Sequence, residues 1–179
     1  MTRGFLVIAL SVSFFASVSV VEPLRAQAQQ SENCPHSKTN CSPSDHDVRM
    51  SRGERAMGFS QTNSTHHFLL KPDGGIISVS ANDLQDSATR DQIRMHLNHI
   101  AQAFGTGDFN IPMFVHDQTP AGVPIMKRLA KKIRFQFQET ANGGAVVISS
   151  GSREAVRAIH DFLIFQIREH QTGDPTMIP

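Results

Sequence analysis

The chain has 179 residues and a formal net charge of +1, which is too balanced to favour nucleic acid or a strongly anionic surface as a partner. It contains 12 phenylalanines but no tryptophan or tyrosine, so aromatic packing relies on a ring without a polar group. Without an expected leader, about 150 residues remain, which suits one domain with its own core.

Residues 1–28 have the pattern of a secretory signal peptide. Arg3 precedes an apolar run over residues 4–21, and Ala26, Gln27 and Ala28 offer small residues for cleavage. An uncleaved anchor is the alternative, but serines and the pair Glu22 and Pro23 interrupt the run. We therefore expect a periplasmic or secreted protein with no nucleic-acid partner and no stable membrane span after cleavage.

Residues 29–55 are expected to form a disordered linker, because so few aliphatic residues cannot offset the entropy of ordering. This segment contains Cys34 and Cys41, for which an oxidising compartment favours a disulfide. A Cys/His metal cluster that adds His36 and His46 is the alternative. A single domain over residues 56–175 and a tail over residues 176–179 complete the expected organisation.

The first predicted elements are a hairpin and a helix. Two β-prone runs, 66–71 and 76–81, flank Pro72, Asp73, Gly74 and Gly75, which is typical turn chemistry. Residues 87–104 then place apolar side chains at helical spacing. These are Ile93, Leu97, Ile100 and Phe104.

A Pro-rich connector over residues 108–122 and a short helix over 123–131 lead to a second hairpin and helix. The hairpin pairs residues 133–138 with 145–149, and the last helix starts after Ser152 and ends near His170. The tripeptide Thr-Gly-Asp follows both long helices. We predict an α+β fold of two ββα units, with a four-stranded antiparallel sheet and helices on one face. The polar residues of the other face are Ser78, Ser80, Arg134, Gln136 and Gln138.

Several histidines and methionines are candidate metal ligands, because imidazole binds copper and zinc and thioether favours Cu(I). The candidates are His66, His67, His96, His99, His116, Met57 and Met113. His96 and His99 are three residues apart and are expected to share a helix face. His66 and His67 point to opposite faces of a strand, so only one can join a given site. Hydrogen-bonding and gap-filling roles are the alternative.

Two further patterns suggest other chemistry. His116 and Asp117, on an expected exposed loop, are the candidate acid–base pair of a small enzyme, although no serine elbow or reactive cysteine supplies a nucleophile. The basic residues of segment 127–134 suit an anion or form a solvated helix face. We therefore favour a small exported binding protein for copper or zinc over a catalyst. The alternative is an interaction module whose polar sheet face docks an exported protein partner.

Phrases over residues 56–175, among them STHHFLLKPDGGII, IRMHLNHIAQAF and GDFNIPMFVHDQTPAGVP, resemble a family of small exported bacterial proteins without an established activity. Relatives are sometimes labelled aspartate carbamoyltransferase. The phosphate-binding pattern Ser-Thr-Arg-Thr of that enzyme is missing, the nearest string being Ser87, Ala88, Thr89 and Arg90. The mature chain is also short for a two-domain transcarbamoylase, so the resemblance implies no mechanism.

Overall fold

The computed structural model describes residues 45–178. Along the chain the elements are α1 (Asp45–Met57), η1 (Gln61–Asn63), β1 (Ser64–Lys71), β2 (Gly74–Ala81), α2 (Ser87–Gly105), α3 (Asn110–His116), α4 (Val123–Arg128), η2 (Ala130–Lys132), β3 (Arg134–Thr140), β4 (Gly143–Ser149) and α5 (Arg153–His170). The cysteine pair and the expected leader lie outside the described residues, as do residues 29–44 of the expected linker.

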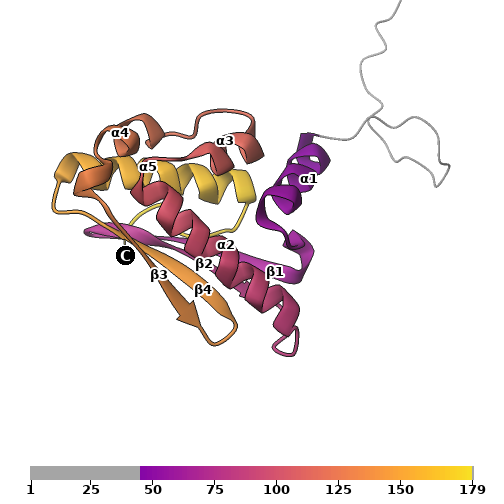
Figure 1. The fold of residues 1–179 in the computed structure, drawn as a ribbon. Helices are drawn as coiled ribbons and strands as arrows, with labels where there is room; N and C mark the ends of the chain where they lie inside the picture. Colours follow the sequence, from indigo (N-terminus) through magenta and orange to yellow (C-terminus); the bar gives the residue numbers. More distant parts are fainter. Residues whose placement is uncertain (1–44, 179) are drawn as a thin grey trace, which may run out of the picture. The chain divides into compact units, whose positions relative to one another are not determined.

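The four strands form one antiparallel sheet in the order β1-β2-β4-β3. Each hairpin turn joins neighbouring strands, and the two hairpins meet through β2 and β4, where Ile77 pairs with Val146. The helices lie over one face of this sheet (Figure 1). The predicted α+β fold of two ββα units with a four-stranded antiparallel sheet is therefore confirmed.

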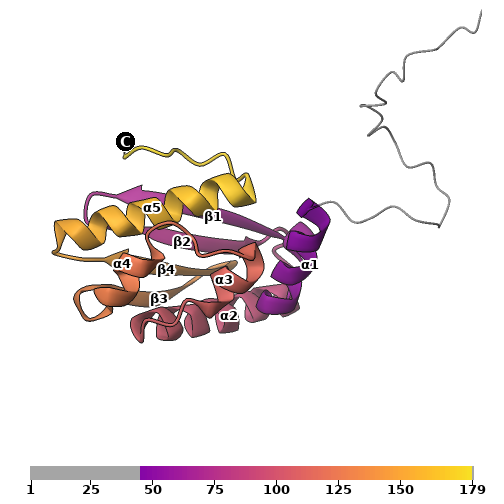
Figure 2. The same cartoon turned by 90° about the horizontal axis from the view of Figure 1, so that it is seen from above.

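Each long helix packs on the hairpin of the other repeat. α2 follows the first hairpin but contacts mainly β3 and β4, whereas α5 follows the second and contacts β1 and β2. Figure 2 shows α2 and α5 on either side of the smaller helices α3 and α4. Two glycines allow the close approach. A Cβ on Gly75 would collide with Leu163 of α5, and one on Gly144 would collide with Phe137 of β3 and crowd Leu97 of α2.

Two helices occupy segments that the sequence assigned to irregular structure. α1 covers residues 45–55 of the expected linker. Its buried Gly53 leaves room for the Gln61 side chain, whose amide donates to the Met50 carbonyl (3.2 Å). α3 lies within the Pro-rich connector. Pro112 is tolerated there because it stands in the first helical turn, where its missing N–H has no helical partner.

The segment after α5 folds back against β1, the edge strand of the sheet. Asp174, whose side chain is only 8% exposed, accepts hydrogen bonds from the Phe68 N–H (2.9 Å) and the Thr172 hydroxyl (2.6 Å), and its other oxygen lies 2.9 Å from His67 Nδ1. Burial alone would raise the Asp174 pKa, but these hydrogen bonds and the His67 charge bring it below its ordinary value. Asp174 thus fastens the C-terminal segment to β1.

The core lies between the sheet and the helices. At its centre Phe104 and Phe109 stack on each other and Phe162 meets both edge-on, and all three rings are almost fully buried. Within residues 45–178, no helix is both long enough and apolar enough to cross a membrane.

Candidate functional site

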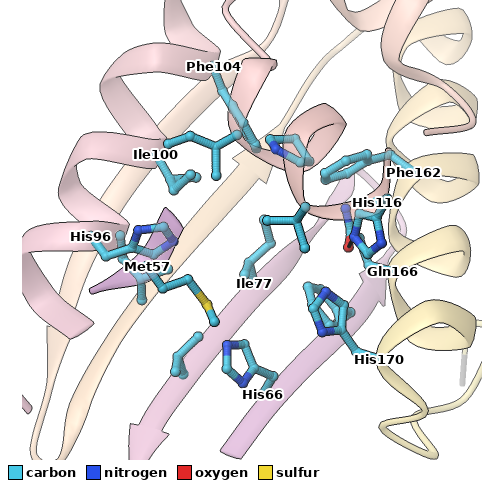
Figure 3. Close-up of a pocket in the computed structure, with 16 residues that line it drawn as sticks. Met57, His66, Ile77, His96, Ile100, Phe104, His116, Phe162, Gln166 and His170 are labelled. Atoms are coloured by element: carbon cyan, nitrogen blue, oxygen red, sulfur yellow. Dashed lines mark hydrogen bonds between the residues drawn. The ribbon is translucent and has the colours of Figure 1, made fainter. Parts of the chain in front are cut away.

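A pocket of about 80 Å3 opens between α2 and α5, above β1 and β2. Most of its wall is apolar, but side chains with ring nitrogens, a thioether and an amide also face it (Figure 3). These polar or soft side chains are Met57, His66, His96, His116, Gln166 and His170. The pocket therefore gathers four of the nine histidines of the chain.

Each imidazole reaches the pocket from a different element. His66 lies on the helix-covered side of β1, where it pairs across the sheet with Val79. His96 is on α2 beside the buried Leu97. His116 is the last residue of α3, and His170 is the last residue of α5. Segments far apart in sequence are brought together because α5 crosses over the first hairpin.

Three of the rings form a row along the pocket wall. His66 and His170 stack with centroids 5.7 Å apart and planes 9° apart, and His170 meets His116 edge-on at 5.1 Å. His96 lies on the α2 side of the pocket, and Phe59 contacts both His96 and His66, with ring centroids 5.8 Å and 6.2 Å away. Aromatic neighbours therefore restrict the orientation of all these imidazoles.

Burial keeps two of these imidazoles neutral. The pKa of His66 is lowered from 6.5 to about 4, first by burial and then by the charge of His67. The pKa of His96 is also lowered to about 4, by burial and then by the charges of His66 and His99. At neutral and mildly acidic pH both rings thus carry a free lone pair, which is the form that binds metal ions.

His66 presents an unsatisfied nitrogen. Its Nε2 is buried and has no hydrogen-bond partner in the described part of the chain. Buried polar atoms without a partner are uncommon and costly. Figure 3 shows the Met57 sulfur, carried by the C-terminal end of α1, beside the His66 ring, with the His96 ring next to the Met57 side chain on the side of α2. Two imidazoles and one thioether therefore face the same part of the pocket.

His116 is held at the other end of the row. Its ring is buried, and Nε2 lies 2.9 Å from the Gln166 side-chain oxygen while Nδ1 lies 3.6 Å from a Glu169 oxygen. The expectation of an exposed loop histidine beside Asp117 is wrong. Asp117 is strongly exposed, adopts a left-handed conformation and pairs with Arg52 at 3.0 Å. The carboxylate near His116 is Glu169, so the pair His116 and Asp117 is not oriented for acid–base work.

Three of the predicted ligands lie away from the pocket. His67 faces the opposite side of the sheet and contacts Asp174. Met113 is half-buried with its sulfur 3.8 Å from Lys127 Nζ. His99 is exposed although it shares α2 with His96. At about 100° per residue, His96 lies roughly 70° from the centre of the buried stripe and His99 roughly 130°, so only the first faces inward.

Sequence reasoning missed His170 and Gln166. Gln166 and His170 continue the apolar stripe of α5, three and seven residues after Leu163, so the helical spacing was the available signal. The assignment was missed because His170 stands in the last turn, where a histidine is also favoured by the helix dipole.

No three His, Cys, Asp or Glu side chains within residues 45–178 are arranged to hold a metal ion. The alternative cluster with Cys34, Cys41, His36 and His46 lies outside the residues and side chains that the structure describes. The Met57 thioether is a candidate donor of another type that faces the pocket.

The other repeat has phenylalanines at the positions of the pocket histidines. Taking Gly144 as the counterpart of Gly75, the strand register makes Phe135 the counterpart of His66. Taking Leu97 as the counterpart of Leu163 makes Phe104 that of His170 and Phe162 that of His96. The rings of Phe104 and Phe135 are 5.7 Å apart, as are those of His66 and His170.

Comparison of the chain with models of known protein families, with curated proteins and with solved structures gives no match.

Proposed function

We propose that this chain is a small copper-binding protein, and that His66, His96 and Met57 hold a Cu(I) ion in the pocket. The observation that carries the proposal is the buried Nε2 of His66, which has no partner among the described residues and lies beside the Met57 sulfur. A bound ion would satisfy this nitrogen, which otherwise adds a cost to folding.

The donor set favours Cu(I) over zinc. Thioether is a soft ligand that suits Cu(I), whereas zinc sites take four ligands from Cys, His, Asp and Glu. Two imidazoles and one thioether therefore suit Cu(I) and do not make up such a zinc site. The apolar wall around them also favours a singly charged ion over a doubly charged one, because burial of charge is costly in an apolar environment.

The size of the pocket supports an ion more than an organic ligand. A volume of about 80 Å3 admits an ion or a few water molecules, whereas small-molecule sites usually measure about 300 Å3 or more. The remaining imidazoles are suited to an outer role. His170 stacks on His66 and His116 supports His170, which would fix the direction of the ligating nitrogen.

The comparison of the two repeats supports a role beyond folding. At the matching positions of the other repeat, Phe135 and Phe162 of the second repeat and Phe104 of the first lie in the core or against it, whereas the pocket has His66, His96 and His170. Phenylalanine gains more from burial than histidine does, and it has no pKa that burial must lower. The imidazoles at these positions cost stability, which is expected of residues retained for binding.

The test is an anaerobic Cu(I) titration of the full chain against a chromophoric Cu(I) chelator, with matched variants. We expect one tightly bound ion, and at least a tenfold loss of affinity in His66→Ala, His96→Ala and Met57→Leu. Each variant has an outward-facing control of the same residue type nearby, namely His67→Ala, His99→Ala and Met95→Leu, since Met95 is 68% exposed. The controls are expected to bind like the wild type.

X-ray absorption at the copper edge adds a direct readout of the ligands. The wild type should show one sulfur neighbour that disappears in Met57→Leu and remains in Met95→Leu. Equal Cu(I) affinity in the pocket variants and their controls would overturn the proposal, as would a copper spectrum that Met57→Leu leaves unchanged.

A further inference from the structure

A second groove, of about 760 Å3, lies where η2 and the start of β3 meet the turn between β4 and α5. Its polar lining consists mainly of cations and hydroxyls. The side chains that matter here are Lys131, Lys132, Arg134, Ser149, Ser150 and Asp73. None of them belongs to the histidine pocket, so the groove is a separate feature of the fold.

The strand register places another cation at the same end of the sheet. Lys71 pairs with Gly74, Gly74 with Ser149, and Ser149 with Arg134. This row crosses all four strands on the face that the helices leave uncovered, and it has a cation on each edge strand. The small residues between them leave that end of the sheet open.

The groove cations are not paired with a carboxylate among the described residues. Lys131, Lys132 and Arg134 form no ion pair there, and Asp73 is the one carboxylate in the described lining. Neighbouring Arg128, by contrast, is paired with Glu154. In a chain whose formal charge is only +1, three unpaired cations in one groove are a local concentration of positive charge.

Backbone contacts tie the walls of the groove together. The Ser150 N–H donates to the Asp73 carbonyl (2.9 Å), and the Ser150 hydroxyl donates to the Lys132 carbonyl (2.7 Å). The first hairpin turn, η2 and the turn before α5 are thereby joined. The cations consequently project from connected segments rather than from independent loops.

We infer that this groove binds the phosphate group of a small phosphorylated molecule or of an anionic lipid headgroup. A phosphate monoester carries close to two negative charges and a lipid phosphodiester carries one, and both accept hydrogen bonds from several directions, which suits the lysine, arginine and Ser149 donors around one space. The volume exceeds that of a lone inorganic ion, so there is room for the organic part of the ligand. This inference is independent of copper binding.

The test uses the full chain with two triple variants that remove the same charge. In the groove variant, Lys131, Lys132 and Arg134 are each changed to Gln. In the control, Lys127, Arg157 and Arg168 are changed to Gln, because these cations lie outside the groove. Pyrophosphate binding is measured by calorimetry. Binding to phosphatidylcholine vesicles with and without phosphatidylglycerol is measured by sedimentation.

We expect saturable pyrophosphate binding that weakens at least tenfold in the groove variant, weakens with added salt and is unchanged in the control. Binding to phosphatidylglycerol vesicles without pyrophosphate binding would identify a lipid headgroup as the source of the phosphate. The N-terminal segment is common to all variants, so its effect on sedimentation cancels. No binding of either probe, or equal losses in both triple variants, would overturn the inference. Cu(I) uptake should be the same in all three proteins.

Discussion

Acid should destabilise the metal-free protein because His66 and His96 are neutral in the folded state. Their pKa values are about 4 in the folded protein and 6.5 ordinarily. As the pH falls from 6.5 to about 4, the unfolded chain binds protons that the folded chain does not, so the free energy of unfolding decreases. Above pH 6.5 the full stability is present, and below about pH 4 the loss is complete.

The expected loss is large for a domain of this size. A pKa lowered from 6.5 to about 4 corresponds to about 3 kcal/mol for each imidazole, at about 1.36 kcal/mol per pH unit. Small domains have a total stability of about 5–15 kcal/mol. Protonation of both rings, which also repel each other, would therefore remove a large part of the folding free energy.

Urea unfolding over a pH series, with a metal chelator present, measures this effect in the wild type, in His96→Leu and in His99→Leu. The His96→Leu protein should lose about 3 kcal/mol less than the wild type between pH 7 and pH 4. His99→Leu should follow the wild type because His99 is exposed. Carboxylates that titrate in the same range contribute equally to all three. If the His96→Leu and wild-type curves are parallel, the reasoning is refuted.

Three further predictions concern packing, the C-terminal segment and copper. Gly75→Ala should reduce the free energy of unfolding by about 1–3 kcal/mol because the new methyl group meets Leu163, whereas Gly151→Ala, which meets no atom within 4 Å, should change little in the same urea assay. Asp174→Asn should lower the free energy of unfolding by about 1–3 kcal/mol above pH 4. This difference from the wild type should disappear at lower pH, where Asp174 becomes protonated. A loss no larger than that of the exposed Asp161→Asn would contradict the contacts described. Cu(I) affinity should stay constant from pH 7 down to about pH 5 and fall below about pH 4. A decline that begins near pH 6.5 would show that the ligating imidazoles have ordinary pKa values.

The fold was predictable from local patterns that repeat along the chain. Two Gly-Gly turns between β-prone runs, each followed by a helix with one apolar stripe, were enough to indicate the two ββα units. α1 and α3 were not predictable in the same way. α1 has a polar sequence, and α3 is short and contains Pro112. Helices of this kind depend on contacts with the rest of the domain, and local sequence contains no record of those contacts.

The site was only partly predictable because it depends on the crossing of the helices. Strand alternation restricted the choice to one of His66 and His67, and the apolar stripe of α2 could have favoured His96 over His99. His170 reaches the pocket because α5 packs on the first hairpin and not on its own. That choice depends on tertiary packing, which residue spacing within α5 does not reveal.

The two repeats allow a direct test of whether the pocket histidines serve the fold. In the double variant His66→Phe with His170→Phe, β1 and α5 take an aromatic pair like the one that Phe135 of β3 and Phe104 of α2 form. The ring separation is 5.7 Å in both cases, and the adjacent pocket can accept the extra atoms. At pH 7 the double variant should be at least as stable as the wild type, with a gain of about 1–2 kcal/mol from apolar burial.

The reverse exchange, Phe135→His with Phe104→His, should cost about 3–5 kcal/mol, because it places two imidazoles in a filled core. Urea unfolding of both double variants measures the difference, and Cu(I) uptake should be lost only in the variant without His66. If replacing His66 and His170 by phenylalanine destabilises the domain as much as the reverse exchange does, these imidazoles are required for folding. The repeat comparison would then no longer support a binding role, because the same fold would need different aromatic rings in its two halves.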